Sequence, residues 1–217
     1  LSTYLPIFLV DTSIMAKSRI LVVGAGGIGT IAAYALEKND KAEVTAVMRS
    51  NYDAAVESGI DIDSPEHGQI KAWRPIASAE SLDELNIFVH TAIRRLANRV
   101  QVVKSVPDVS KSDVAPFDYI LVTTKNIPDS KPTVADIIAP AVTPGKTAIV
   151  LSQNGINIEK PLIERFPTNP LISSVVYTGA NEIEKAKVYS DEPDTQKIGA
   201  FVTPQVPSKV AEEAAKR

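Results

Sequence analysis

The sequence of 217 residues contains no cysteine, which excludes disulfide bonds, thiolate metal sites and a cysteine nucleophile. Its only two histidines, His67 and His90, lie far apart without the spacing of metal ligands, so we expect no metal site. Basic residues are not in excess either, because the net charge is −3. This charge gives no indication of a nucleic-acid partner.

Long apolar runs are also absent. No run approaches the roughly 20 residues of a membrane-spanning helix, and the chain does not begin with the basic segment of a signal peptide. In the absence of such signals we expect a cytoplasmic protein without a membrane partner. The composition, with 44% apolar and 23% charged residues, is typical of a globular protein, and the length allows one large domain or one domain plus a fragment.

The most informative stretch runs from Ile20 to Gly29, where an apolar, β-branched run stops at glycines spaced G-x-G-x-x-G, and a helical pattern follows at once. Strand, glycine turn and helix in this order indicate dinucleotide binding, whereas a glycine turn that binds nothing is the alternative. Gly24 allows the chain to turn, Gly26 lets the backbone approach a pyrophosphate, and Gly29 lets the helix lie close to the strand. The predicted cofactor-binding residues of this turn are Gly24, Ala25, Gly26, Gly27, Ile28 and Gly29.

The next expected strand, residues 43–48, ends in Arg49. In proteins that bind NAD, this position usually carries an acidic residue that accepts a hydrogen bond from the ribose 2′-hydroxyl. A guanidinium group instead suits the 2′-phosphate of NADP. The residue type therefore favours NADP. Asp53 is an alternative acceptor that would allow NAD, and a solvated arginine at a strand end is the simplest alternative.

Two later strands also lead into polar residues. Residues 117–124 are followed by Lys125, and residues 146–151 are followed by a Ser-Gln-Asn-Gly segment that contains Asn154. Ligands of parallel sheets bind beyond the carboxyl ends of the strands, where these groups and Arg49 would meet the glycine turn. Lys125 would supply positive charge or hold the cofactor ribose, and Asn154 would orient a ligand. A solvated loop lysine and a turn-forming Asn-Gly pair are the alternatives.

Strands alternating with helices predict a parallel, doubly wound α/β sheet of the Rossmann type. Residues 59–63 and 69–73 alternate like a hairpin or a third strand, with Trp73 expected to pack rather than bind cofactor. Residues 185–189 and 196–201 resemble an antiparallel ribbon. The remaining expected strands are 19–23, 43–48, 117–124, 146–151 and 171–177, and the expected helices are 28–38, 52–58, 131–139, 156–166 and 207–217.

Three segments fall outside this pattern. Residues 1–16 are expected to be an N-terminal extension, with an edge strand or packing arm as the alternative for residues 1–14. Residues 75–105 delay the next strand beyond usual connection lengths, so we interpret them as an insertion, with a helix capped by Ser81. We expect the nucleotide-binding domain to cover residues 17–201, and residues 202–217 to form a linker and the first helix of a truncated second domain.

Three motifs in the same order resemble those of ketopantoate reductases (2-dehydropantoate 2-reductases). They are Val23-Gly-Ala-Gly-Gly-Ile-Gly29, Val122-Thr-Thr-Lys125 and Gln153-Asn-Gly155, and Ile198-Gly199 also fits. The resemblance covers residues 17–74 and 106–201. It implies reduction of ketopantoate to pantoate with NADPH, on the route to pantothenate and coenzyme A.

The resemblance also assigns roles to individual residues. Arg49 would meet the 2′-phosphate, Thr124 would contact the cofactor, and Lys125 and Asn154 would lie near the nicotinamide and the substrate, where they are the candidate catalytic residues. The insertion is foreign to the family. The chain also lacks the helical C-terminal domain of the family. That domain holds a catalytic lysine, and a homodimer would form through it. The chain is therefore expected to be a fragment, a truncated form or a protein without turnover.

Two other functions remain open from the sequence. One is a non-catalytic NADP-binding or redox-sensing module. The other is a related reductase that acts on a different 2-keto acid or on an imine.

Overall fold

The computed structural model describes residues 17–38, 41–73, 100–111 and 114–216. The N-terminal extension and the helix predicted from Ser81 lie outside these ranges. The described strands are β1 (Ser18–Val23), β2 (Ala42–Val47), β3 (Ile60–Ser64), β4 (Gly68–Trp73), β5 (Val100–Val103), β6 (Tyr119–Val122), β7 (Ala148–Leu151), β8 (Leu171–Val176), β9 (Ala180–Glu184), β10 (Lys187–Ser190) and β11 (Gln196–Ala200). The described helices are α1 (Gly27–Lys38), α2 (Tyr52–Ser58), α4 (Val134–Ile138), the 3-10 helix η2 (Ala139–Ala141), α5 (Lys160–Arg165) and α6 (Ser208–Lys216).

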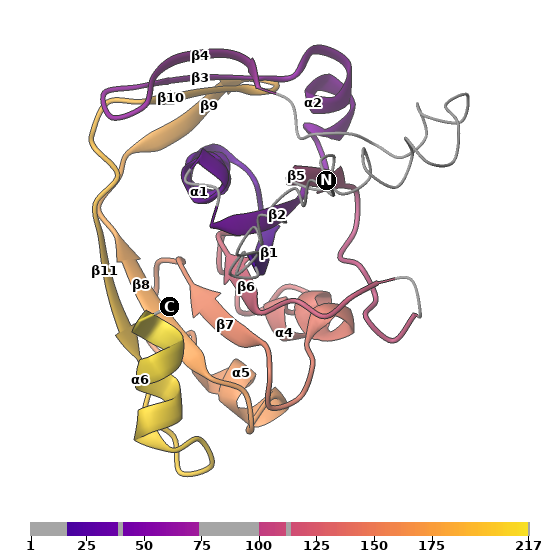
Figure 1. The fold of residues 1–217 in the computed structure, drawn as a ribbon, viewed down its shortest axis with the longest axis vertical. Coiled ribbons are helices and arrows are strands. Elements are labelled where there is room, and N and C mark those ends of the chain that lie inside the picture. Colours follow the sequence, from indigo (N-terminus) through magenta and orange to yellow (C-terminus); the bar gives the residue numbers. More distant parts are fainter. Residues whose placement is uncertain (1–16, 39–40, 74–99, 112–113, 217) are drawn as a thin grey trace, which may run out of the picture.

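The larger sheet has seven strands in the order β11-β8-β7-β6-β1-β2-β5. All neighbouring pairs are parallel except β11, which runs antiparallel to β8 (Figure 1). The parallel strands follow the order of a doubly wound dinucleotide-binding sheet, with the reversal of strand order between β1 and β6. The predicted α/β fold class is therefore confirmed.

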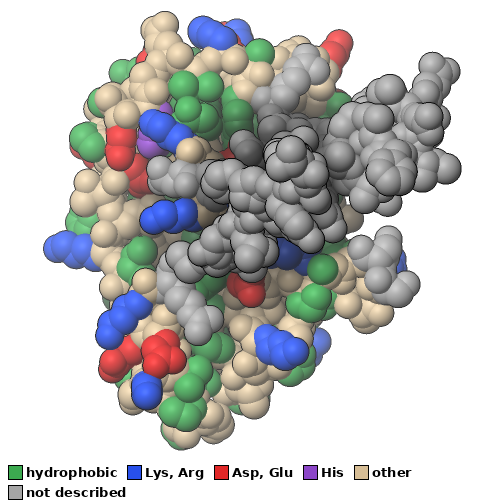
Figure 2. Space-filling view, viewed as in Figure 1, with side chains coloured by type: hydrophobic (Ala, Val, Ile, Leu, Met, Phe, Trp, Pro, Cys, Tyr) green, Lys and Arg blue, Asp and Glu red, His purple; other side chains and the backbone are tan. Residues whose placement is uncertain are grey.

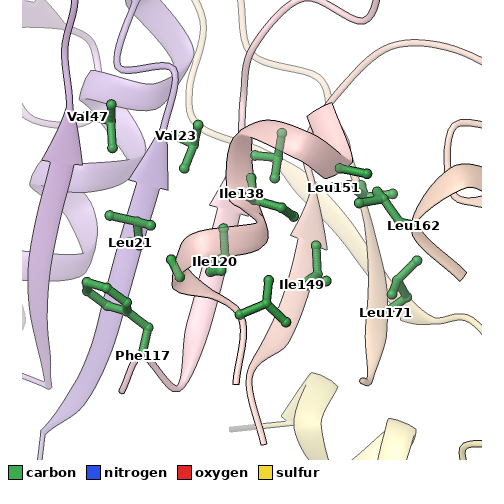
Figure 3. Packing of buried hydrophobic residues seen from close by; sticks show 14 residues of the cluster. Leu21, Val23, Val47, Phe117, Ile120, Ile138, Ile149, Leu151, Leu162 and Leu171 are labelled. Atoms are coloured by element: carbon green, nitrogen blue, oxygen red, sulfur yellow. The ribbon is translucent and has the colours of Figure 1, made fainter. Parts of the chain in front are cut away.

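Burial on both faces explains why the central strands are almost continuously apolar. In β1, Leu21 and Val23 belong to a cluster that also contains Ile138 of α4 and Leu162 of α5 (Figure 3). The alternate residue Val22 belongs to a second cluster on the opposite face, where α1 packs. Helices on both faces thus hold the strand ends in fixed relative positions.

A second sheet, β4-β3-β10-β9, covers α1 on the side away from the larger sheet (Figure 1). Ile60 and Ile62 of β3 and Val188 of β10 pack in one apolar cluster with Ile31 of α1. Trp73 at the end of β4 stacks edge-on against Tyr34 of α1, and its indole Nε1 donates a hydrogen bond to Glu37 Oε2 at 2.9 Å. The expectation that Trp73 is a packing residue is confirmed.

Two expectations about the strands are wrong. Residues 185–189 and 196–201 do not pair with each other, because β10 joins the second sheet beside β3 while β11 joins β8 in the first. The expected insertion also ends too late, since Val100–Val103 forms β5, which pairs with β2 in parallel register. The hairpin of β3 and β4 is confirmed as a hairpin and is not a strand of the larger sheet.

The helix ends follow local capping chemistry. The helix expected at residues 131–139 begins at Val134, after a capping box in which Thr133 and Asp136 exchange hydrogen bonds. The helix expected at residues 156–166 begins only at Lys160. Helix α6 packs against β8 and β11. Within the described ranges, no helix has the length and apolar character needed to cross a membrane.

Candidate nucleotide-binding site

The glycine turn lies between β1 and α1, next to the point where the strand order reverses. Gly24 has a φ of +101°, a conformation that side-chain-bearing residues rarely adopt, and a Cβ there would lie 2.7 Å from the backbone nitrogen of Thr124. The amide of Gly26 donates to the Gly24 carbonyl at 2.7 Å, which closes the turn. Gly24 therefore serves the turn, as its sequence position predicted, and it also allows the segment after β6 to approach closely, which was not predicted.

The other glycines of the turn serve different purposes. A Cβ on Gly29 would lie 2.6 Å from the Gly24 carbonyl oxygen, so this glycine allows α1 to lie close to β1. A Cβ on Gly27 would collide with the carbonyl oxygen of Ala180 at the start of β9. At Gly26, in contrast, a Cβ would meet no atom of a described residue within 4 Å. The backbone at Gly26 thus borders open space, which fits the approach of a pyrophosphate.

A hydrogen-bond network connects the ends of β1, β6 and β7. The Thr123 hydroxyl donates to the Gly24 carbonyl at 2.7 Å, and so ties the glycine turn to β6. The side-chain amide of Gln153 donates to the Thr124 carbonyl at 2.7 Å and lies 3.1 Å from the Thr124 hydroxyl. These bonds set the relative position of the segments that carry Lys125 and Asn154.

The two candidate catalytic residues follow adjacent strands. Lys125 lies just beyond β6 and Asn154 just beyond β7, and both side chains are exposed. The two loops approach each other, because a Cβ on Gly155 would lie 3.5 Å from the side-chain amide nitrogen of Asn126. The structure thus brings both residues to the edge of the sheet that carries the glycine turn.

Arg49 lies at the same edge, beyond β2. Its side chain is exposed, and no ion pair joins it to any residue in the described ranges. Asp53, the alternative acceptor for an NAD ribose, forms an ion pair with Lys104, with 2.9 Å between Oδ1 and Nζ. The Asp53 carboxylate raises the pKa of Lys104 by accepting this hydrogen bond. Among the described residues, Arg49 is thus without an ion-pair partner, whereas the Asp53 carboxylate is engaged.

Sequence reasoning missed Thr123, Gln153 and Lys104. Thr123 was visible as part of a motif, but its hydrogen-bond partner depends on the strand order. Gln153 was quoted in a motif without a role. Ser152, next to it, has a buried hydroxyl without a hydrogen-bond partner among the described residues.

The distribution of charged side chains on the surface does not point to a further ligand site. Figure 2 shows lysine and arginine side chains dispersed among acidic and apolar ones over the described part of the visible face. The described residues contain no group of three or more His, Asp or Glu side chains that could hold a metal ion. The glycine turn and its neighbouring strand ends are therefore the best-supported site.

Comparison with known proteins identifies the family. A family profile described as "Ketopantoate reductase PanE/ApbA" matches residues 20–203. The chain belongs to this family. The matched range includes the glycine turn, Arg49, Lys125 and Asn154, and the resemblance noted from the motifs is confirmed over residues 20–203.

Relatives and solved structures agree with this family. An uncharacterised protein of Saccharomyces cerevisiae is 33% identical over 198 residues, which are 85% of this chain and 49% of that protein. The 2-dehydropantoate 2-reductase of Methylococcus capsulatus has the same fold, with a TM-score of 0.62, 23% identity and coverage of 91% of this chain and 54% of its own. D-mandelate dehydrogenase, solved as a ternary structure with NADH and anilino(oxo)acetate, superposes with a TM-score of 0.60 and 14% identity over 91% of this chain and 53% of its own. The chain thus spans about half the length of the family proteins that it matches.

Proposed function

We propose that this chain is the nucleotide-binding part of an NADPH-dependent reductase of 2-keto acids, with 2-dehydropantoate as the substrate, on the route to pantothenate. Family membership supports the reaction class. The cofactor choice is carried by one observation: within the described ranges the cation at the end of β2 has no ion-pair partner, while Asp53, the nearby carboxylate, is engaged by Lys104. A dianionic phosphate is the cofactor group that such an arrangement favours.

The residues of the site fit this cofactor. The backbone at Gly26 borders open space where a pyrophosphate would bind, and Arg49 would hold the 2′-phosphate. When bound, NADPH supplies the hydride for the reduction of the keto group. Lys125 is exposed at the edge of the sheet, where its ammonium group can donate a hydrogen bond to an oxygen that gains negative charge. Asn154 can both donate and accept, so its role is orientation.

A cofactor titration tests the first part of this proposal. The 217-residue chain should bind NADPH more tightly than NADH. Replacing Arg49 by alanine should remove a charge-assisted contact of roughly 1.5–3 kcal/mol and weaken NADPH binding about ten- to a hundredfold. NADH binding should change little. Equal losses for both cofactors would contradict the 2′-phosphate assignment.

A substrate panel tests the second part. With NADPH at saturation, a full-length protein that contains this chain should reduce 2-dehydropantoate faster than 2-oxo acids with other side chains, as followed by the absorbance of NADPH. The fold shared with D-mandelate dehydrogenase makes aromatic 2-keto acids the second candidate class. If an aromatic 2-keto acid such as phenylglyoxylate is reduced faster, then 2-dehydropantoate is not the substrate and the aromatic class takes its place in the proposal. NADPH binding without turnover of any member of the panel would favour a non-catalytic module.

A further inference from the structure

A second cation lies beside Arg49 at the edge of the sheet. Val47 of β2 and Val103 of β5 are register partners, and the Met48 amide donates to the Val103 carbonyl at 2.9 Å. Arg49 and Lys104 therefore leave neighbouring parallel strands, which are about 4.8 Å apart in any sheet. The two cations emerge at the same end of the sheet, on the side of β1 where the strand order places the adenosine half of a dinucleotide.

Local contacts hold the Lys104 side chain in place. Its ammonium nitrogen lies 2.9 Å from Asp53 Oδ1 and 4.7 Å from the centre of the Tyr52 ring. The Lys104 and Asp53 side chains are 61% and 84% exposed, so both remain accessible to a ligand. An exposed ion pair contributes little to stability, because water screens it. A bound anion can therefore recruit the lysine at little cost to the fold.

We propose that Lys104 determines cofactor specificity together with Arg49. It presents a second positive charge to the 2′-phosphate of NADPH, and it withholds from NADH the Asp53 carboxylate that would otherwise accept a hydrogen bond from the ribose hydroxyl. This inference rests on the proposed use of NADPH.

The charges of Arg49, Lys104 and Asp53 predict the direction in which the loss of Lys104 changes ligand affinity. With Lys104 present, the carboxylate is neutralised and the local charge remains positive through Arg49. Without Lys104, the free Asp53 carboxylate repels a phosphate and becomes an acceptor for a hydroxyl. Loss of the lysine should therefore weaken binding of the phosphorylated ribose in two ways. Removal of the carboxylate as well should abolish the repulsion, but it should not replace the positive charge that Lys104 supplied.

Calorimetric titration with two cofactor fragments tests this inference without any turnover. The ligands are 2′,5′-ADP, which carries the 2′-phosphate, and 5′-ADP, which does not. Lys104→Met should weaken 2′,5′-ADP binding about ten- to a hundredfold. It should not weaken 5′-ADP binding, which the freed Asp53 carboxylate should strengthen by accepting a hydrogen bond from the 2′-hydroxyl. The double variant Lys104→Met/Asp53→Asn should recover part of this loss. The control Lys71→Met removes a lysine of similar exposure that pairs with Asp61 on the second sheet, and it should change neither affinity.

The outcomes distinguish the inference from the proposed function. If the unaltered chain prefers 2′,5′-ADP and Lys104→Met keeps this preference, Lys104 has no part in specificity although the cofactor assignment stands. If Lys104→Met weakens both ligands equally and lowers the melting temperature, the lysine only anchors α2 to β5, and the inference is wrong. If the unaltered chain does not prefer 2′,5′-ADP, both the cofactor assignment and the inference are wrong.

Discussion

Two glycines of the same turn should respond to substitution in opposite ways. Gly26 borders open space and Gly29 is enclosed by the Gly24 carbonyl and the Thr123 hydroxyl, each 2.6 Å from the position of its Cβ. Gly26→Val should therefore leave the fold intact while its side chain occupies the space that a pyrophosphate needs. Gly29→Ala should destabilise the fold, because α1 must move away from β1 to make room for one methyl group.

The two substitutions should change the melting temperature by amounts that differ enough to be distinguished. Forcing a methyl group into a well-packed contact costs about 1–3 kcal/mol. For a chain of this size, each kcal/mol shifts the melting temperature by about 2–4 °C. Gly29→Ala should thus lower it by about 2–12 °C. Gly26→Val should shift it by less than about 2 °C, since a Cβ at this position meets no described atom within 4 Å. The loss of even one backbone contact to a phosphate would weaken NADPH binding about tenfold or more.

Thermal unfolding of the unliganded chain and titration with NADPH measure the two effects separately. The expected pattern is a stable Gly26→Val variant that fails to bind and a destabilised Gly29→Ala variant. Unchanged NADPH affinity in Gly26→Val would refute the reasoning, because the open space at Gly26 would then have no connection with the cofactor. A large fall in its melting temperature would refute the steric part.

Further predictions concern the strand ends and the capping box. Gln153→Leu should leave the Thr124 carbonyl without its donor, at a cost of about 1–3 kcal/mol. In a full-length protein that contains this chain, it should lower kcat more than NADPH affinity, because the segment carrying Lys125 loses its support; unchanged kinetics in the variant would contradict this. The Thr133 hydroxyl and backbone amide lower the pKa of Asp136 by hydrogen bonding to its carboxylate, so this stabilisation is present above the ordinary pKa of 3.8 and is lost as the pH falls below it. The difference in melting temperature between Asp136→Ala and the unaltered chain should therefore be constant near neutral pH and should become smaller in acid. A constant difference down to about pH 2 would contradict the assignment.

The parallel sheet could be predicted because its local signals agree with its tertiary contacts. The run from Ile20 to Val23 is apolar at every position, as a strand buried on both faces requires, and Gly24, which follows, adopts a positive φ that residues with side chains rarely adopt. The partners of β10 and β11 could not be predicted in this way. Their alternation is compatible with mutual pairing, and only the positions of β3 and β8 in space decide which sheet each strand joins.

The site was predictable to the extent that it depends on strand ends. Arg49, Lys125 and Asn154 each follow an apolar run, so the carboxyl-end rule placed them together without knowledge of the strand order. Lys104 follows a four-residue strand whose identity depends on pairing with β2. Its role was hidden for this reason, because no local pattern shows that residues 100–103 extend the sheet.

The pairing of β3 with β10 has a consequence for how the chain folds. Val188 lies beside Ile62 in parallel register, although most of the larger sheet separates them in the sequence. During synthesis, the β3–β4 hairpin is made early but must wait for the segment of β10 before its sheet is complete. Such non-local pairing requires a long loop to close before any stabilising contact forms, and this loss of entropy slows folding. The apolar cluster over α1 should accordingly close late, and a partly synthesised chain would expose that face to aggregation.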